Sequence, residues 1–332
     1  WMAGRYRFGR SIYLSREQAL KALPGVNENG LLGGVGYFDG QFDDSRLAIN
    51  LAQTCVEKGG TVLNYLQVTG LLKDEQGIVN GVKAYDLENQ KAYLLRSKTV
   101  INATGVFVDE VLTMDTPLRR QLVRPSQGVH LVFDRQFLKG RSALMIPKTS
   151  DGRVLFAVPW HDHVLVGTTD TPVVASSIEP KPLSAEVDFI LRTISQYFTR
   201  APHREDILSV FAGLRPLPAS AQNIDSTKEI SPSHKILVAS SKLITIVGGK
   251  WTTYRKMAED AINRAIEISD LQKVRCCTES LGIHGFAEWL DDSLGIYGSD
   301  RAHIVEMVAR VPHLGEKIHP RLSYILAEVI WA

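Results

Sequence analysis

The stretch Ile244–Lys256, I-T-I-V-G-G-K-W-T-T-Y-R-K, decides the fold of this chain. Its first four residues predict a buried strand, the paired glycines end that strand, and the two threonines that follow can begin a helix. A strand–turn–helix unit of this kind points free backbone N–H groups at whatever lies beyond the carboxyl end of the strand. The positive end of the helix dipole favours an anion in the same place.

Three cations, Lys250, Arg255 and Lys256, crowd this helix start, where a sequence selected for stability alone would place Asp or Glu. Cations beside a positive helix end cost stability unless a negative group binds there. We therefore predict an anionic ligand at this turn. The alternative is an ordinary glycine turn with solvated lysines.

A second β-branched run, Thr99–Gly105 (T-V-I-N-A-T-G), also ends in glycine. A glycine just past a parallel strand lets a cofactor approach the backbone closely, although a strand-terminal glycine is more often only a turn.

The residues before this run predict a helix, a strand and an antiparallel meander. Together with the run, these elements would make half of a nucleotide-binding α/β unit. The helix has Asp43 as its N-cap. The predicted elements are a helix over Asp43–Gly60, a strand over Thr61–Val68, and an antiparallel excursion over Ile78–Leu95 with turns at Asn80-Gly81 and Glu88-Asn89.

Between about Leu122 and Leu237 short alternating segments predominate, so we predict a mainly antiparallel sheet inserted into the α/β domain. The predicted strands are Val129–Phe133, Val154–Val158, Val164–Thr168 and Val210–Leu214, with one helix over Ala185–Phe198. The α/β pattern resumes with a strand at Leu243–Val247, a helix from Tyr254 to about Ser269, and a small helical domain over His284–Ala332.

Two side chains of the inserted sheet could carry chemistry. Arg215 stands among apolar residues in A-G-L-R-P-L, where a cation is costly to bury unless it is paired. Its guanidinium suits a phosphate or a carboxylate, with an internal salt bridge as the alternative. His130 begins an apolar strand, where a histidine is more often a hydrogen-bonded core residue than a catalyst. The hydroxyl-rich stretch Gly167–Thr171 could line a site or form a strand-ending turn.

The composition excludes several classes of protein. The 38 basic and 36 acidic residues give a net charge of +2 and form no basic stripe of the kind that binds nucleic acid. Three cysteines cannot form an even disulfide framework, which favours free thiols in a reducing cytoplasm. The run His161-Asp162-His163 lacks a third ligand, so we predict no metal site. No apolar run reaches the roughly 18 residues of a membrane span, which leaves peripheral membrane association open.

Seven motifs follow one another along nearly the whole chain. They are G-Y-F-D-G-Q-F-D-D-S-R-L at Gly36–Leu47, I-N-A-T-G at Ile101–Gly105, G-V-H at Gly128–His130, D-G-R at Asp151–Arg153, G-T-T-D-T at Gly167–Thr171, G-L-R-P-L at Gly213–Leu217, and G-G-K-W-T-T-Y-R-K-M-A-E-D at Gly248–Asp260. In this order they resemble the FAD-dependent glycerol-3-phosphate dehydrogenase family.

The resemblance implies oxidation of sn-glycerol 3-phosphate to dihydroxyacetone phosphate, with hydride transfer from C2 to FAD and electrons passed to a membrane quinone. It makes Arg215 a phosphate clamp, His130 the candidate base, and Lys250 a stabiliser of negative charge on the reduced flavin. The FAD contacts it implies are Val68, Ala103, Thr104, Gly105, Gly249, Lys250, Trp251 and Thr252.

The expected fold is mixed α/β. An incomplete FAD-binding Rossmann-like domain over 1–110 returns at 238–270, an antiparallel substrate domain is inserted at 111–237, and a truncated helical segment occupies 280–332. We expect a cytoplasmic protein with peripheral contact at the inner face of the cytoplasmic membrane and no nucleic-acid partner. A homodimer is compatible with the sequence.

Two departures from the family pattern matter. The G-x-G-x-x-G loop of the family is expected before residue 1, and without this main pyrophosphate cradle we expect the chain alone to bind FAD weakly or not at all. Pro232 stands where similar proteins usually have an arginine that helps to grip the phosphate. His234 and Lys235 are the candidates to replace that arginine; otherwise substrate affinity is reduced.

Three alternative functions remain open at this stage. A glycerol-3-phosphate oxidase shares these motifs and passes its electrons to oxygen. An amine oxidase of the same flavoprotein superfamily binds a carboxylate and needs no phosphate clamp. The third alternative is a folded fragment without activity.

Overall fold

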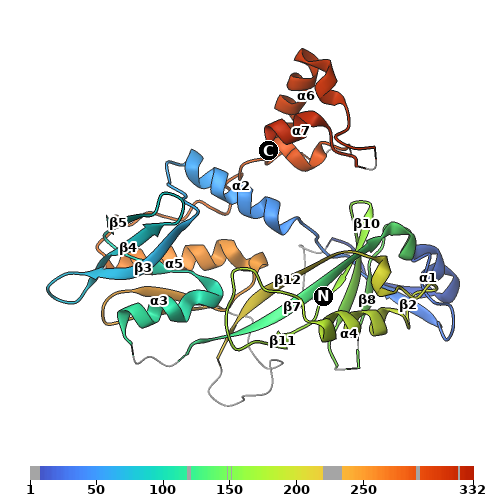
Figure 1. Cartoon of the computed structure of the whole chain (residues 1–332), viewed down its shortest axis with the longest axis horizontal. Coiled ribbons are helices and arrows are strands. Elements are labelled where there is room, and N and C mark those ends of the chain that lie inside the picture. Colours follow the sequence, from blue (N-terminus) through green and yellow to red (C-terminus); the bar gives the residue numbers. More distant parts are fainter. Residues whose placement is uncertain are drawn as a thin grey trace. The chain divides into compact units, whose positions relative to one another are not determined.

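The computed structural model describes residues 8–117, 121–147, 149–150, 152–219, 234–288, 292–320 and 322–332. By its contacts the chain forms two compact units (Figure 1). Unit 1 comprises Trp1–Asp39 and Gln67–Val274, and unit 2 comprises Gly40–Leu66 and Arg275–Ala332. The predicted mixed α/β fold class is confirmed. The finer domain boundaries expected at 110, 237 and 270 stay a prediction.

The largest sheet of unit 1 is antiparallel and is organised around one long strand, β7 (Val123–Asp134). The strand β12 (Ile207–Pro218) pairs with β7 along its whole length, and Figure 1 shows the two as long neighbours. The other strands of this sheet are β8 (Leu144–Ile146), β9 (Leu155–Trp160), β10 (His163–Gly167) and β11 (Thr171–Pro172). All four strands predicted for this region are present, and β7 and β12 are longer than predicted.

The core of this sheet follows from its sequence alternation. Val129, Leu131 and Phe133 alternate along β7 and are fully buried. The helix α4 (Ser184–Ile194) packs on the same face and buries Ile190 and Ile194. This packing places one face of β7 in the hydrophobic core of unit 1.

A second sheet of unit 1 contains the stretch that decides the fold. Its strands, in the order β13–β14–β6, are β13 (Lys235–Val238), β14 (Ile244–Val247) and β6 (Ile101–Asn102), with β14 parallel to β6. Every residue of β14 is buried, as predicted. The helices α3 (Val108–Asp115) and α5 (Tyr254–Ile268) belong to the same region, and α5 buries Ala261 and Ala265.

The predicted meander exists, with two corrections. It is the sheet β3 (Leu66–Lys73), β4 (Val79–Asp86) and β5 (Lys91–Arg96). The strand predicted from Thr61 begins only at Leu66. The turn predicted at Asn80-Gly81 is wrong, because those residues lie inside β4 and the chain reverses earlier, where the Asp74 carboxylate accepts the N–H groups of Gln76 and Ile78. The turn at Glu88-Asn89 is confirmed.

The glycine-rich segment Gly33–Gly36 forms strand β2, which pairs antiparallel with β1 (Ile12–Ser15). The helix α1 (Arg16–Ala22) follows β1 directly, and Ser15 and Gln18 cap its start reciprocally. The four residues of β2 therefore build a small sheet of unit 1 and form no phosphate-binding loop.

Unit 2 is helical. Its first helix, α2 (Asp44–Glu57), begins with the Asp43 carboxylate accepting the N–H of Arg46, as the sequence predicts. Two further helices, α6 (Arg301–Arg310) and α7 (Leu326–Trp331), share a small core with Tyr297.

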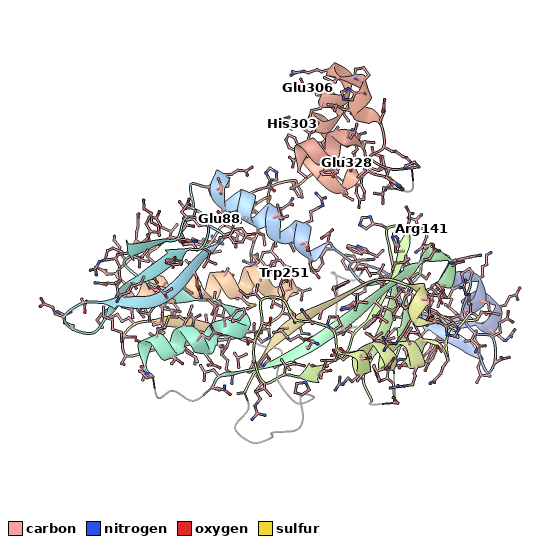
Figure 2. All side chains as sticks on the ribbon, viewed as in Figure 1. Glu88, Arg141, Trp251, His303, Glu306 and Glu328 are labelled. Atoms are coloured by element: carbon pink, nitrogen blue, oxygen red, sulfur yellow. The ribbon has the colours of Figure 1, made fainter. Side chains whose placement is uncertain are left out.

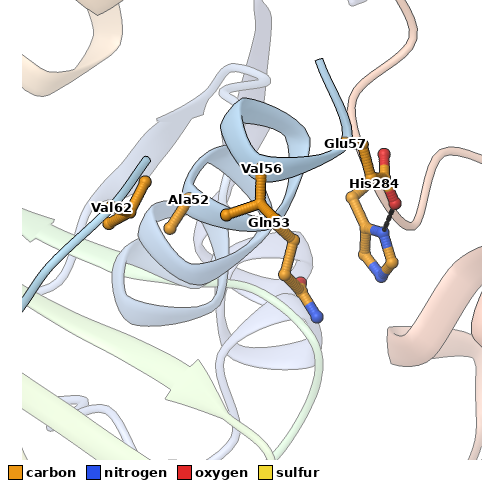
Figure 3. A pocket seen from close by; sticks show the side chains of 6 residues that line it. All are labelled: Ala52, Gln53, Val56, Glu57, Val62 and His284. Atoms are coloured by element: carbon orange, nitrogen blue, oxygen red, sulfur yellow. Dashed lines mark hydrogen bonds and ion pairs between the residues drawn. The ribbon is translucent and has the colours of Figure 1, made fainter. Parts of the chain in front are cut away.

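A histidine ties the two chain segments of unit 2 together. The ring of His284 lies 2.6 Å from the Glu57 carboxylate through Nδ1 (Figure 3) and 2.8 Å from Asp300 through Nε2. Asn50 donates to its carbonyl at 2.6 Å. The hydrogen bond with Glu57, opposed by partial burial and supported by Asp300, raises the pKa of His284 above its ordinary value.

This contact predicts a pH-dependent stability. Because the folded pKa is the higher one, the stabilisation is complete below the unfolded value of about 6.5 and is lost as pH rises through the folded pKa. The midpoint of thermal unfolding should therefore fall as pH rises above neutrality, and His284→Gln should flatten this part of the profile. The control His303→Gln removes a histidine of α6 that stacks on Trp331 and should keep the fall. A His284→Gln profile identical to that of the wild type would contradict the assignment.

Candidate functional site

Three of the sequence motifs meet on strand β7. Gly128 and His130 belong to β7 itself, the segment 168–170 links β10 to β11 along one edge of β7, and Arg215 lies on β12 along the other edge. The register places Phe211 opposite His130 and Arg215 opposite Ser126. Sheet topology thus gathers side chains that are far apart in the sequence.

The guanidinium of Arg215 is held by neutral oxygens. Its Nη1 donates to the carbonyl of Thr169 at 3.0 Å, and its Nη2 donates to the hydroxyl of Thr168 at 2.9 Å. The carboxylate of Asp170 is 3.6 Å away and accepts a hydrogen bond from Ser126 as well. The internal salt bridge considered from the sequence is therefore present but long, and 36% of the Arg215 side chain remains exposed. The guanidinium is both oriented and accessible to an anion.

Gly128 provides the space in which this guanidinium lies. A methyl group at position 128 would be 2.5 Å from Nη2 and 2.7 Å from Nη1 of Arg215. Only glycine allows the cation to lie directly on the strand. Gly213, on β12, has nothing within 4 Å of the same position and serves no such purpose.

His130 lies in an apolar stack beside this cation. Its ring is parallel to Phe211, with the ring centroids 5.1 Å apart, and a methyl group at Gly167 would overlap it. Burial, and then the positive charge of Arg215, lower the pKa of His130 to about 4. The imidazole is therefore neutral at physiological pH and can accept a proton.

The second group of predicted residues lies at one edge of the β13–β14–β6 sheet. Because β14 and β6 are parallel, with Thr245 beside Asn102, the segments that follow them leave the sheet at the same edge. These segments are Ala103–Gly105 and Gly248–Thr252. The backbone is left-handed at Gly105 (φ 60°), Gly248 (φ 74°) and Gly249 (φ 82°), which explains the glycines.

The charge prediction at this turn is wrong for two of the three cations. Arg255 lies 3.1 Å from Glu259, and Lys256 lies 2.8 Å from Asp260, so helix α5 neutralises both with carboxylates one turn later. Lys250 differs from them, because within the described part of the chain its ammonium has no ion pair. Of these three cations, Lys250 is therefore the candidate to face a ligand.

The features of this edge fit a cofactor that carries negative charge. Lys250, Trp251 and Thr252 are exposed, and Figure 2 shows Trp251 at the start of α5. The hydroxyl of Thr245 is buried on β14, only 1% of the residue is exposed, and no described group hydrogen-bonds to it.

Asn102 orders the neighbouring turn, a role that the sequence reading missed. Its amide donates to the carbonyl of Val108 at 2.9 Å, and its Oδ1 accepts the hydroxyl of Thr104 at 2.7 Å. The sequence could have indicated this role of Asn102, because a polar residue inside the β-branched run Thr99–Gly105 must find hydrogen-bond partners when it is buried.

The remaining predicted residues belong to neither of these two groups of side chains. Val68 lies on β3, in a different sheet from β6, the strand that Ala103–Gly105 follow. His234 contacts the Asp260 carboxylate at 3.0 Å and lies beside Gly249. Pro232 and Asp151 fall outside the described residues. No three metal-binding side chains cluster among the residues that the structure describes.

A pocket of about 350 Å³ lies elsewhere, in unit 2 (Figure 3). It is lined by Ala52, Gln53, Val56, Glu57, Val62 and His284. None of the predicted site residues lines it, and its walls are mainly apolar.

Comparison with known proteins agrees with the resemblance seen in the motifs. The family model described as FAD dependent oxidoreductase matches residues 2–255. A probable mitochondrial glycerol-3-phosphate dehydrogenase of Caenorhabditis elegans is 34% identical, over 100% of this chain and 49% of that protein. The mitochondrial glycerol-3-phosphate dehydrogenase of Schizosaccharomyces pombe is 36% identical, over 86% of this chain and 47% of that protein.

Among solved structures, the glycerol-3-phosphate dehydrogenase of Bacillus halodurans complexed with FAD is 29% identical, with a TM-score of 0.75. The match covers 92% of this chain and 57% of that one. The chain thus spans about half the length of the curated relatives it matches.

The fit between Gly128 and Arg215 predicts a selective loss of anion affinity. Gly128→Ala should push the guanidinium off the strand and away from its threonine partners. The dissociation constant of a phosphate-bearing ligand, measured by calorimetry on the full-length protein, should then rise by about 10-fold, as expected for one lost hydrogen bond to a charged group. Gly213→Ala is the matched control on the paired strand. Equal affinities for the two variants would contradict the role of Gly128.

Proposed function

The chain belongs to the FAD-dependent oxidoreductase family, and on that premise we propose that it is part of an enzyme that oxidises sn-glycerol 3-phosphate to dihydroxyacetone phosphate. The observation that carries the proposal is the partly exposed Arg215 side chain, whose guanidinium is fixed over Gly128 beside a neutral histidine. The names of the relatives support the choice of substrate.

Arg215 binds the phosphate in this proposal. With a net charge of only +2, the whole molecule gives little electrostatic attraction, so a local cation must capture an anionic substrate. Two acceptors already orient Arg215, and a phosphate at its exposed side would add charge-assisted hydrogen bonds without reorganising the side chain. Asp170, at 3.6 Å, offsets only part of the positive charge.

His130 takes the proton of the substrate C2 hydroxyl. A base must be neutral before the reaction, and the low pKa of His130 ensures this. A bound phosphate would offset the charge of Arg215 that helps to hold this pKa down. Phosphate binding would thus remove the smaller of the two causes of the low pKa of His130, while burial, the larger cause, would remain.

Lys250 serves the cofactor. FAD, the cofactor of the family, supplies the acceptor for the hydride that leaves C2. Lys250 lies at the edge where the carboxyl ends of β6 and β14 meet, and no described carboxylate pairs with it. With the cofactor bound, this ammonium would lie at its polar part and would stabilise negative charge on it.

We extend the proposal to a quinone as final electron acceptor, with peripheral membrane contact; the family resemblance of the motifs supports both. Among the described residues, no helix is both long enough and apolar enough to span a bilayer.

The full-length protein provides the direct test. Anaerobic addition of glycerol 3-phosphate should bleach the absorbance of its bound flavin, and glycerol, which lacks the phosphate, should not. Under air, little peroxide should form. The proposal would be contradicted if the protein purified without flavin, or if glycerol 3-phosphate did not reduce its flavin. Stoichiometric peroxide would favour the oxidase.

A matched pair of variants tests Lys250. Lys250→Met should slow flavin reduction at saturating glycerol 3-phosphate by at least about 10-fold, because a preorganised charge next to the reacting centre is lost. Lys256→Met removes a cation from the same helix start, but one that Glu259 and Asp260 already neutralise. Stopped-flow reduction rates should therefore differ between the two variants, and equal rates would exclude Lys250 from this role.

A further inference from the structure

A buried carboxylate lies behind the anion site. Glu186 is on helix α4, only 4% of it is exposed, and no sequence motif points to it. Its Oε1 accepts the hydroxyl of Thr169 at 3.0 Å, and its Oε2 accepts the Gln127 amide at 2.8 Å and the N–H of Leu183 at 2.9 Å. One carboxylate thus joins the start of α4, strand β7 and the segment before β11.

Thr169 connects this carboxylate to Arg215. Its hydroxyl donates to Glu186 and accepts the backbone N–H of Val129, while its carbonyl accepts Nη1 of Arg215. Thr169 is itself 2% exposed. The position of the carbonyl that orients the guanidinium is therefore set by bonds made on the buried side of the same residue.

The charge of Glu186 is compatible with this role. Burial raises the pKa of its carboxyl, but hydrogen bonds from Thr171, Leu183, Gln127 and Thr169 lower it further, so that the net pKa is below its ordinary value. An ionised carboxylate accepts from all of these donors at once, which a neutral amide in its place cannot do.

We propose that Glu186 is a positioning residue for the phosphate site: through Thr169 it holds the Arg215 guanidinium in the orientation that binds the substrate. This inference rests on the proposed function. Glu186 touches neither substrate nor cofactor, and it acts on affinity by fixing a carbonyl oxygen. Its removal should weaken substrate binding more than it slows the reaction of bound substrate.

The test is steady-state kinetics of the full-length enzyme with glycerol 3-phosphate. Glu186→Gln keeps the volume but replaces one acceptor oxygen with an amide that faces other donors. KM should rise by about 10-fold, while kcat changes by less than about 3-fold, because the loss falls on binding. Arg215→Ala should raise KM by about 10–100-fold through the loss of one charged hydrogen-bond pair.

The double variant separates positioning from general damage. If Glu186 acts through Arg215, Glu186→Gln adds nothing to KM once Arg215 is alanine, so the two effects are not additive. Additive effects would overturn the proposal.

Glu328→Gln is the matched control. Glu328 is also 4% exposed and accepts the N–H of Ile325 at the start of α7, as Glu186 accepts that of Leu183 at the start of α4. Glu328 belongs to unit 2 and also hydrogen-bonds Tyr297, so its substitution tests the general cost of removing a buried, hydrogen-bonded carboxylate. KM should stay at the wild-type value, and a rise equal to that of Glu186→Gln would overturn the proposal.

A second pair of variants covers the case in which Glu186→Gln does not fold. Thr169→Val removes the hydroxyl that Glu186 holds, and Thr169→Ser keeps it. The valine variant should raise KM more than the serine variant. Equal KM values would contradict the connection from Glu186 through Thr169 to Arg215.

Wild-type turnover with an unchanged KM in Glu186→Gln defeats this inference alone. Absence of wild-type turnover defeats the proposed function, and this inference with it.

Discussion

The orientation of one guanidinium is the constraint on which the site depends. Arg215 lies flat on Gly128 of β7, and two oxygens from the segment 168–169 hold its two terminal nitrogens. Strand pairing on both edges of β7 is required, because the cation comes from β12 and its acceptors follow β10. The same cation helps to keep His130 neutral. Phosphate binding by Arg215 and proton acceptance by His130 therefore both depend on the position of this guanidinium.

The edge of the β13–β14–β6 sheet differs from the Arg215 site, because carboxylates of the same helix neutralise most of the positive charge there. Helix α5 neutralises Arg255 and Lys256 internally, which leaves Lys250 as the cation at the glycine turn without a described partner. Parallel pairing of β14 with β6 brings this turn to the same edge as Ala103–Gly105. A cofactor with a polar, negatively charged part suits that edge, and the assignment of these residues to FAD remains our proposal.

Local features of the fold were predictable from the sequence, and features that depend on register were not. The Asp43 cap, the buried strand β14 and helix α5 each follow from a few adjacent residues. The pairing of Arg255 with Glu259 was also readable from its spacing and was missed. The convergence of Gly128, Thr168 and Arg215 requires the pairing register of three strands, which no local pattern contains. For the same reason Glu186 could not be identified as a site residue from the sequence, since its partners come from distant segments.

The most direct measurement is a crystal structure of the full-length protein with dihydroxyacetone phosphate bound. Our account predicts phosphate oxygens within hydrogen-bonding distance of the Arg215 guanidinium, with its bonds to Thr168 and Thr169 retained. A phosphate bound elsewhere, with Arg215 turned away from those threonines, would contradict it.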